Sequence, residues 1–219
     1  EADIWPLAVQ GPKAEDLLVR IFSEEIRKIS FFHSKKMDYA GVELLVARSG
    51  WSKQGGFEIY VNDPEIGRKL WDQLFIAGED MDVRAGCPNL IERIESGLLS
   101  FGGDMDYNTT PFECGLDKYV SLNTNIESLS IPALRNRQIK TRLMGIVIDK
   151  KVDLIDLRLF NNGKEIGKIT TNTWSPKYQR HLAFAKCNIK NTDEEQELYV
   201  NSSDGEVSAK MTELPFNFE

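Results

Sequence analysis

Histidine and cysteine, the residues most often used for general-base, nucleophilic and metal-binding chemistry, are scarce in this chain. Among 219 residues there are two histidines, His33 and His181, and three cysteines, Cys87, Cys114 and Cys187. The histidines lie far apart, so we expect no histidine-based catalytic pair and no metal site, although His33 acting alone stays open. The cysteines are odd in number and form no Cys-x-x-Cys pair, which favours reduced, buried thiols in a cytoplasmic protein over a disulfide framework or a zinc site.

A basic surface and long apolar runs are also missing. The formal net charge is −7, from 27 Lys and Arg against 34 Asp and Glu. Nucleic acids and anionic membranes bind clustered Lys and Arg, so neither is expected as a partner. The densest basic run, Arg135 to Arg142, is interrupted by Ile139 and Thr141, and we interpret it as one solvated helix face. No apolar run approaches the roughly 20 residues that span a bilayer, and no signal-peptide pattern opens the chain.

What the chain does contain is an ordinary globular composition, 41% hydrophobic and 28% charged, in a length that suits one large or two small domains. Its first part predicts an α+β layer, a sheet with helices packed on one face. Extended segments are expected at 5–10, 29–36, 36–39, 42–47 and 57–61, and helices from 12, 64 and 88 onwards. The helix from Pro64 has Asp63 as its expected N-cap and Gly78 as its expected end. Trp71 in this helix and Leu90 in the next are expected to be buried.

The last third of the chain changes to short alternating strands separated by turn residues. Strands are expected at 143–148, 155–160, 166–171, 181–187, 197–200 and 207–211. Six short strands at this spacing predict a small antiparallel β-barrel or a sandwich. We place the domain boundary near residue 140, giving domains 1–140 and 141–219. The chain begins with Glu1 and soon enters a helix, which is untypical of a natural start, so we expect a piece of a longer protein.

The most informative segment is 50–61, where a glycine-rich turn leads into a strand with clean alternation. Side chains of a strand alternate between its faces. The apolar residues Phe57, Ile59 and Val61 therefore share one face, and Glu58 and Tyr60 share the other. A carboxylate beside a phenol, just after two glycines that let another group approach the backbone, can accept parallel N–H bonds from a planar edge such as that of a pterin. A solvated outer face is the alternative, and the pattern alone leaves both open.

Four segments, taken together and in order, resemble the glycine-cleavage T-protein family of folate-dependent methyl and aminomethyl transferases. They are Leu7–Ala14; Ser49–Tyr60; Arg93–Leu98 with Phe101-Gly102 and Pro111–Leu116; and Gly167–Thr171 through Ser175-Pro176, with Leu214–Phe216 near the end. The resemblance spans nearly the whole chain. It implies part of a folate-binding α/β domain, whose N-terminal portion is missing here, followed by a small C-terminal antiparallel β-barrel, with tetrahydrofolate as the cofactor.

In that family the Glu of the Phe-Glu-Ile motif hydrogen-bonds the pterin edge of tetrahydrofolate, and this role carries over to Glu58. Two residues depart from the aminomethyltransferase pattern: Trp51 stands where a Tyr is usual, and Asn89 where an Arg helps to hold folate. Asn89 keeps some hydrogen-bonding capacity. Together with the run 84–95, these departures resemble the dimethylsulfoniopropionate demethylase branch of the family, whose members move a methyl group from a sulfonium to tetrahydrofolate.

The resemblance therefore implies a tetrahydrofolate-dependent methyltransferase that converts dimethylsulfoniopropionate and tetrahydrofolate to methylmercaptopropionate and 5-methyl-tetrahydrofolate. Glu58, Tyr60 and Asn89 are expected to bind the folate. Trp51 and Tyr60 are expected to bind the small sulfonium substrate, Trp51 by a cation–π contact, with packing of Trp51 under the turn as the alternative. The catalytic residues are unassigned. An aminomethyltransferase of glycine cleavage and a non-catalytic folate-binding protein are the other readings, and a homodimer is left open.

Two expectations concern residues outside this set. Phe32 is expected in the core, with stacking on folate as the alternative. Arg93 and Glu95 stand two residues apart on a helix and do not face each other, so each needs another partner.

Overall fold

The computed structural model describes residues 3–87, 89–191 and 197–218. It contains two compact units, Glu1–Asn89 and Leu90–Glu219. Within the described ranges, no helix has the length and apolar character needed to cross a membrane.

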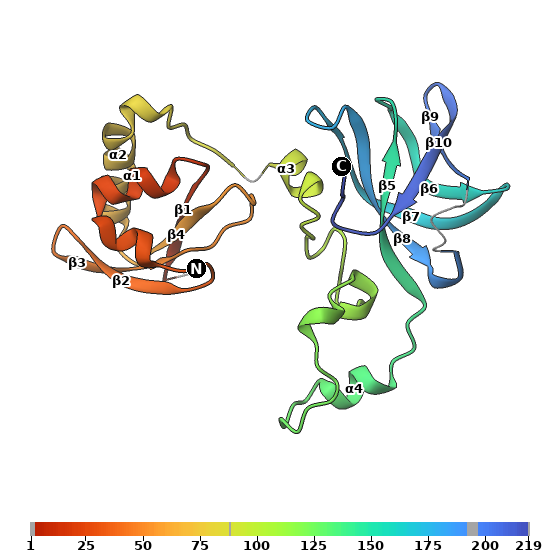
Figure 1. Cartoon of the computed structure of the whole chain (residues 1–219), viewed down its shortest axis with the longest axis horizontal. Coiled ribbons are helices and arrows are strands. Elements are labelled where there is room, and N and C mark those ends of the chain that lie inside the picture. Colours follow the sequence, from red (N-terminus) through yellow and green to blue (C-terminus); the bar gives the residue numbers. More distant parts are fainter. Residues whose placement is uncertain (1–2, 88, 192–196, 219) are drawn as a thin grey trace. The chain divides into compact units, whose positions relative to one another are not determined.

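The first unit is an antiparallel sheet with helices on one face (Figure 1). Its elements are β1 (Trp5–Gln10), α1 (Ala14–Ile21), the 3-10 helix η1 (Glu24–Lys28), β2 (Ser34–Tyr39), β3 (Val42–Ala47), β4 (Gly56–Val61), α2 (Pro64–Ala77) and η2 (Glu79–Met81). The strand order is β1-β4-β3-β2. Strand β4 therefore lies inside the sheet, between β1 and β3, so its backbone pairs with a neighbouring strand on both sides.

Local signals in the sequence account for the elements around β4. The Asp63 carboxylate accepts hydrogen bonds from the backbone N–H groups of Glu65 (2.8 Å) and Ile66 (3.4 Å), so it caps α2 as predicted. The helix ends before Gly78, also as predicted. Ala40 and Gly41 both have positive φ (54° and 81°), as a tight two-residue turn between β2 and β3 requires.

The apolar face of β4 forms the centre of the first core. Phe57, Ile59 and Val61 are buried and pack with Leu17 and Leu18 of α1 and with Leu70 and Leu74 of α2. The predicted alternation of β4 is thus confirmed, and so is the prediction that helices cover one face of the sheet.

Two aromatic residues of this unit do not lie where we expected. The extended segment predicted from residue 29 begins only at Ser34. Phe32 has a left-handed backbone (φ 59°) and is 79% exposed, so its expected core position is wrong. Backbone bonds from Phe32 N to Arg48 O (2.9 Å) and from His33 N to Ser30 O (3.0 Å) close a turn that projects the ring outward. Trp71 is likewise exposed and packs sideways on Phe75 of its own helix.

In the second unit, strands of the described residues close into an antiparallel barrel (Figure 1). Its elements are α3 (Leu90–Glu95), the 3-10 helices η3 (Pro111–Cys114), η4 (Asp117–Tyr119) and η5 (Ile189–Asn191), α4 (Ile131–Asn136), and strands β5 (Thr141–Ile148), β6 (Leu154–Asn161), β7 (Lys164–Ser175), β8 (Arg180–Asn188), β9 (Leu198–Ser202) and β10 (Gly205–Thr212). The order around the barrel is β10-β5-β8-β7-β6-β9. The predicted barrel is confirmed, and the sandwich is not.

Several predictions for the second unit need correction. The helix expected from Pro88 is α3, which begins at Leu90, and Pro88 itself lies outside the described residues. Leu90 is exposed rather than buried. The basic run is not one helix face, because α4 ends at Asn136 and the run continues into β5. Arg135 donates to the Leu122 carbonyl (3.0 Å). This charged side chain thus supplies a hydrogen bond to a loop carbonyl that lies outside any strand pairing.

The three cysteines are free, but only two of them are buried. Burial raises the pKa of the Cys187 thiol to about 12 and also raises that of Cys114. These two thiols are therefore protonated and inert at neutral pH. Cys87 is exposed, which corrects the expectation that all three are buried.

A buried ion pair holds α3 on the barrel. Arg93 donates through Nη1 to Asp104 Oδ2 (2.5 Å) and to the Leu98 carbonyl (2.9 Å), and its guanidinium lies over the Phe184 ring at 5.6 Å. Asp104 is almost fully buried. Glu95 instead accepts from the Ser175 hydroxyl (2.5 Å), so Arg93 and Glu95 have separate partners, as predicted.

A β-bulge supplies the remaining donors to Asp104. The register between β7 and β8 shifts between Ile169 and Thr171, so that two successive threonines turn toward one side. Thr170 and Thr171 each donate to Asp104 Oδ1 at 2.7 Å. Burial alone raises the pKa of Asp104, but the hydrogen bonds from Thr171, Thr170, the Ser100 N–H and Arg93 outweigh it and lower the pKa below its ordinary value.

Replacing Asp104 with Ala is expected to lower the free energy of unfolding by about 3–5 kcal/mol, because it leaves the Arg93 charge buried without its partner. Urea unfolding of the whole chain measures this. The matched control is Lys210→Ala, which removes an exposed pair with Asp149 and should cost less than about 1 kcal/mol. Equal losses of unfolding free energy in the two variants would contradict the conclusion that the Arg93–Asp104 pair stabilises the barrel unit.

His181 is a second ionisable group buried in the barrel. It lies on β8 opposite Ile148 and Trp174, and its Nε2 is 2.8 Å from the Asn172 Oδ1 oxygen. Among the described residues, its Nδ1 has no hydrogen-bond partner. Burial, and then the nearby charge of Lys151, lower the pKa of His181 below 6.5. The folded barrel therefore favours the neutral ring.

The unfolded chain binds a proton on this residue at a higher pH than the folded chain does. Lowering the pH from about 6.5 to the pKa of His181 in the folded chain should therefore lower the free energy of unfolding. Above about 6.5 the neutral ring makes its full contribution to this free energy. Thermal unfolding between pH 5 and 8 measures this, with His181→Gln as the variant that should lose the dependence. An imidazole NMR titration of His181 with a midpoint at or above 6.5 would count against it.

Candidate functional site

The face of the sheet opposite the helices carries Glu58 and Tyr60. The register places Ala8 of β1 and Ala47 of β3 on either side of Glu58, and Pro6 and Leu45 on either side of Tyr60. Ala8, Pro6 and Leu45 are exposed, whereas Glu58 and Tyr60 are partly buried. Because alanine is the smallest side chain that a strand position commonly carries, the Glu58 carboxylate is open to a planar group laid across this face.

The Glu58 carboxylate is oriented by its own chain. The Ser49 hydroxyl donates a short hydrogen bond to Glu58 Oε2. Ser49 belongs to the loop 48–55, which joins β3 to β4 and also carries Trp51. The loop and the carboxylate are thus one connected feature, which we call the Trp51 loop and define as residues 48–55.

Gln10, the last residue of β1, forms side-chain hydrogen bonds to the Trp51 loop and to the strand that follows it. Its amide Nε2 donates to the carbonyls of Ser49 (3.0 Å) and Phe57 (3.3 Å), and its Oε1 accepts from the Ser52 hydroxyl (3.0 Å). At the exit of the loop, the Gly11 N–H donates to the Gly55 carbonyl (2.9 Å). The loop is therefore tied to β1 at its entry, middle and exit.

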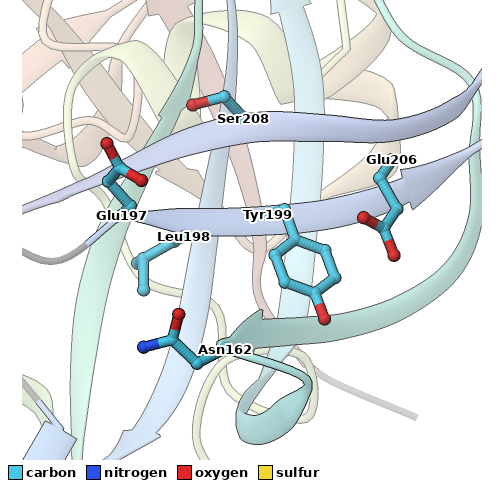
Figure 2. A pocket seen from close by; sticks show the side chains of 6 residues that line it. All are labelled: Asn162, Glu197, Leu198, Tyr199, Glu206 and Ser208. Atoms are coloured by element: carbon cyan, nitrogen blue, oxygen red, sulfur yellow. The ribbon is translucent and has the colours of Figure 1, made fainter.

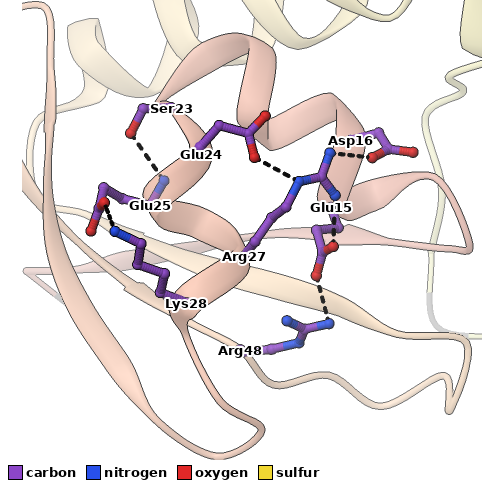
Figure 3. Close-up of polar contacts among 8 residues, drawn as sticks. All are labelled: Glu15, Asp16, Ser23, Glu24, Glu25, Arg27, Lys28 and Arg48. Atoms are coloured by element: carbon purple, nitrogen blue, oxygen red, sulfur yellow. Dashed lines mark hydrogen bonds and ion pairs between the residues drawn. The ribbon is translucent and has the colours of Figure 1, made fainter.

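Charged side chains fix the entry of the loop to α1 (Figure 3). Arg48 binds Glu15 at 2.7 Å and donates to the Ile29 carbonyl (3.2 Å), while its guanidinium lies 5.3 Å from the centre of the Phe57 ring. Glu15 also binds Arg27 (2.8 Å), which in turn binds Asp16 and Glu24. The hydrogen bonds that Arg27 donates to Asp16, Glu15 and Glu24 raise the pKa of its guanidinium. This network joins the helical layer to the first residue of the Trp51 loop.

Gly50 of the loop and Gly56, the first residue of β4, both lie against β1. A Cβ atom on Gly56 would lie 2.4 Å from the Val9 carbonyl oxygen, and one on Gly50 would lie 2.0 Å from Gln10 Oε1. The group that comes close at these two glycines is therefore β1 itself. At Gly55 a Cβ would meet nothing within 4 Å, but its φ of 84° favours glycine.

The structure brings together part of the predicted site. Glu58 and Tyr60 lie side by side on the open face, and Trp51, 41% exposed, lies in the loop that leads into their strand. Asn89 is exposed at the end of the first unit and belongs to none of the strands of this sheet. Sequence reasoning missed Gln10 and Ser49 as supporting residues.

A second concave feature lies on the barrel (Figure 2). Asn162, Glu197, Leu198, Tyr199, Glu206 and Ser208 line an open hollow of about 320 Å³. The Tyr199 ring in its lining stacks on Phe160, with the ring centroids 5.3 Å apart. Neither this hollow nor the open sheet face contains a candidate metal centre: within the described ranges, no three His, Cys, Asp or Glu residues gather in a way that could hold an ion.

Comparison with protein families gives two matches. The glycine-cleavage T-protein (GCVT) N-terminal domain matches residues 1–124, and the glycine cleavage T-protein C-terminal barrel domain matches residues 141–217. The solved structure of glycine cleavage system aminomethyltransferase T from Bartonella henselae has a TM-score of 0.60 at 16% identity, covering 98% of this chain and 84% of that chain. This likeness shows the fold.

Two curated relatives are closer in sequence. Dimethylsulfoniopropionate demethylase DmdA of Ruegeria pomeroyi is 47% identical over 191 residues, which cover 84% of this chain and 51% of that protein. The aminomethyltransferase of Listeria innocua is 32% identical over 220 residues, which cover 98% of this chain and 60% of that protein. The chain thus spans between half and three fifths of the length of these relatives.

Proposed function

Because the chain belongs to the glycine-cleavage T-protein family, we propose that the protein carrying it is a tetrahydrofolate-dependent methyltransferase with dimethylsulfoniopropionate as donor. The observation that carries the proposal is the open face of β4, where Glu58 lies between two alanines and is oriented by Ser49. A carboxylate held this way can accept two parallel hydrogen bonds, one from the amino group and one from the ring N–H on the same edge of a pterin.

The main requirement of the proposed reaction is that the protein align the folate N5 with the methyl carbon of the sulfonium. The folate N5 lone pair forms the new N–CH₃ bond while the S–CH₃ bond breaks, and its electron pair stays on sulfur to give a neutral thioether. The N5 proton passes to solvent. Because the leaving group is neutral and needs no general acid, holding the two reactants in line supplies much of the catalysis. This fits a site of oriented polar and aromatic groups.

The identity of the donor rests on two supports. The relative named as a dimethylsulfoniopropionate demethylase shares 47% of aligned residues with this chain, against 32% for the aminomethyltransferase. The exposed Trp51 and the phenol of Tyr60 also offer aromatic faces to a cation, each worth roughly 0.5–2 kcal/mol. We assign the sulfonium to Trp51 and Tyr60, and the pterin edge to Glu58 and Tyr60.

Asn89 completes the proposed folate site as the polar residue in place of an arginine. Its exposure is compatible with that role. We also retain a domain boundary near residue 140, which falls between the two regions matched by the family domains.

The aminomethyltransferase of glycine cleavage is the second candidate. It is favoured by the extent of the match, since the Listeria innocua relative aligns with 98% of this chain and DmdA with 84%. The two candidates share the folate and differ in the group transferred, so a donor assay separates them.

The protein, expressed at its full natural length, is expected to form 5-methyl-tetrahydrofolate and methylmercaptopropionate from tetrahydrofolate and dimethylsulfoniopropionate.

Glu58→Gln should raise the dissociation constant of tetrahydrofolate by about 10- to 100-fold, because a charged hydrogen-bond acceptor is lost. Titration of tetrahydrofolate by calorimetry measures this. Glu43→Gln, an exposed carboxylate of β3 that pairs with Lys36, is the control and should bind normally. Unchanged affinity in Glu58→Gln would remove the folate assignment, and absence of product with folate still bound would favour the second candidate.

Trp51→Leu is expected to raise KM for the sulfonium by about 2- to 30-fold through loss of the cation–π contact. Trp51→Phe keeps an aromatic face and should lie between the native protein and the leucine variant. Steady-state kinetics with varied donor at saturating tetrahydrofolate measure both. If Trp51 only packs under the turn, the two variants will share the native KM.

A further inference from the structure

The side chain of Gln10 uses its amide as both donor and acceptor. The Nε2 group has two hydrogens, and it meets the carbonyls of Ser49 and Phe57, while Oε1 accepts from the Ser52 hydroxyl. These partners lie 39 to 47 residues away in the sequence. Among natural side chains only the amides of Asn and Gln offer two N–H donors on one nitrogen and a carbonyl acceptor in one plane, and glutamine has the longer reach of the two. The contact is therefore specific to this residue type.

The Trp51 loop is shaped around this side chain. A Cβ on Gly50 would lie 2.0 Å from Gln10 Oε1, and one on Gly56 would lie 2.8 Å from Gln10 Cδ. The backbone at Gly50 of the loop and at Gly56, the first residue of β4, thus approaches Gln10 more closely than any residue with a side chain would allow. Such close packing leaves the amide little freedom to rotate, so its hydrogen bonds fix the path of the loop backbone.

Ser49 connects Gln10 to the proposed folate site. Its carbonyl accepts from Gln10, and its hydroxyl donates to Glu58. The bond to its carbonyl holds the backbone of Ser49 in place, and this sets the position from which the Ser49 hydroxyl reaches Glu58. We infer that Gln10 is a positioning residue for folate binding, which acts through Ser49 on the Glu58 carboxylate. This inference rests on the proposed function of Glu58.

The inference predicts a coupling between residues that do not touch. Gln10→Glu keeps the acceptor for Ser52 but sets an oxygen against the two carbonyls that Nε2 now binds, so Ser49 should shift. With Glu58 present, the dissociation constant of tetrahydrofolate should rise about tenfold, the size of one or two lost hydrogen bonds. In a Glu58→Gln background the same change should have less than about a twofold effect, because the carboxylate on which Gln10 acts is gone.

The experiment is a double-mutant cycle on the protein at its full natural length, with tetrahydrofolate as the ligand and calorimetry as the measurement. Its four proteins are native, Gln10→Glu, Glu58→Gln and the double variant. Gln73→Glu, the same change on the exposed surface of α2, is the matched control and should bind as the native protein does. Gln10→Met, which removes the amide without setting an oxygen against the two carbonyls, replaces Gln10→Glu in the cycle if that variant fails to fold.

A tenfold loss in the native background that disappears in the Glu58→Gln background supports the inference. Equal losses in both backgrounds overturn it and leave the proposed function of Glu58 standing, since a merely structural Gln10 would weaken binding regardless of residue 58. If Glu58→Gln itself leaves folate affinity unchanged, the proposed function fails, and the inference fails with it.

Discussion

The two-residue alternation of β4 is the constraint from which the candidate site follows. Because Phe57, Ile59 and Val61 must be buried against α1 and α2, Glu58 and Tyr60 have to face the other side of the sheet. The same constraint applies to β1 and β3, so the neighbours of Glu58 across the sheet are set by register and not by local choice. A core formed from one face thus determines the chemistry that the opposite face can offer.

Elements with a strong periodic pattern and clear end signals could be predicted from the sequence. The cap at Asp63, the turn at Ala40-Gly41 and the strands of the barrel belong to this group, because neighbouring residues alone specify them. Phe32 and Trp71 could not be placed this way. An apolar side chain favours burial, but its direction depends on which turn the backbone closes and where the helix contacts the sheet, and those depend on distant residues.

In the candidate site, too, the residues close together in the sequence could be predicted and those that depend on distant residues could not. Sequence alone placed Glu58 and Tyr60 on one face and Trp51 close by, because the three lie within ten residues. It could not place Gln10, whose partners lie some forty residues away in the chain. The signal was present in part, since the glycines at 55 and 56 predict a close approach, but a glycine does not say which group approaches it. Only the pairing of β1 with β4 supplies that answer.

Asp104 has a consequence for the order in which the second unit folds. Its donors come from the segment around α3 and from β7, 66 residues further along the chain. A helix of six residues is unstable in water by itself, and the bulge that aims Thr170 and Thr171 exists only once β7 is paired with β8. The full set of contacts that holds α3 in place therefore exists only when β7 is paired with β8, although α3 precedes both strands in the chain.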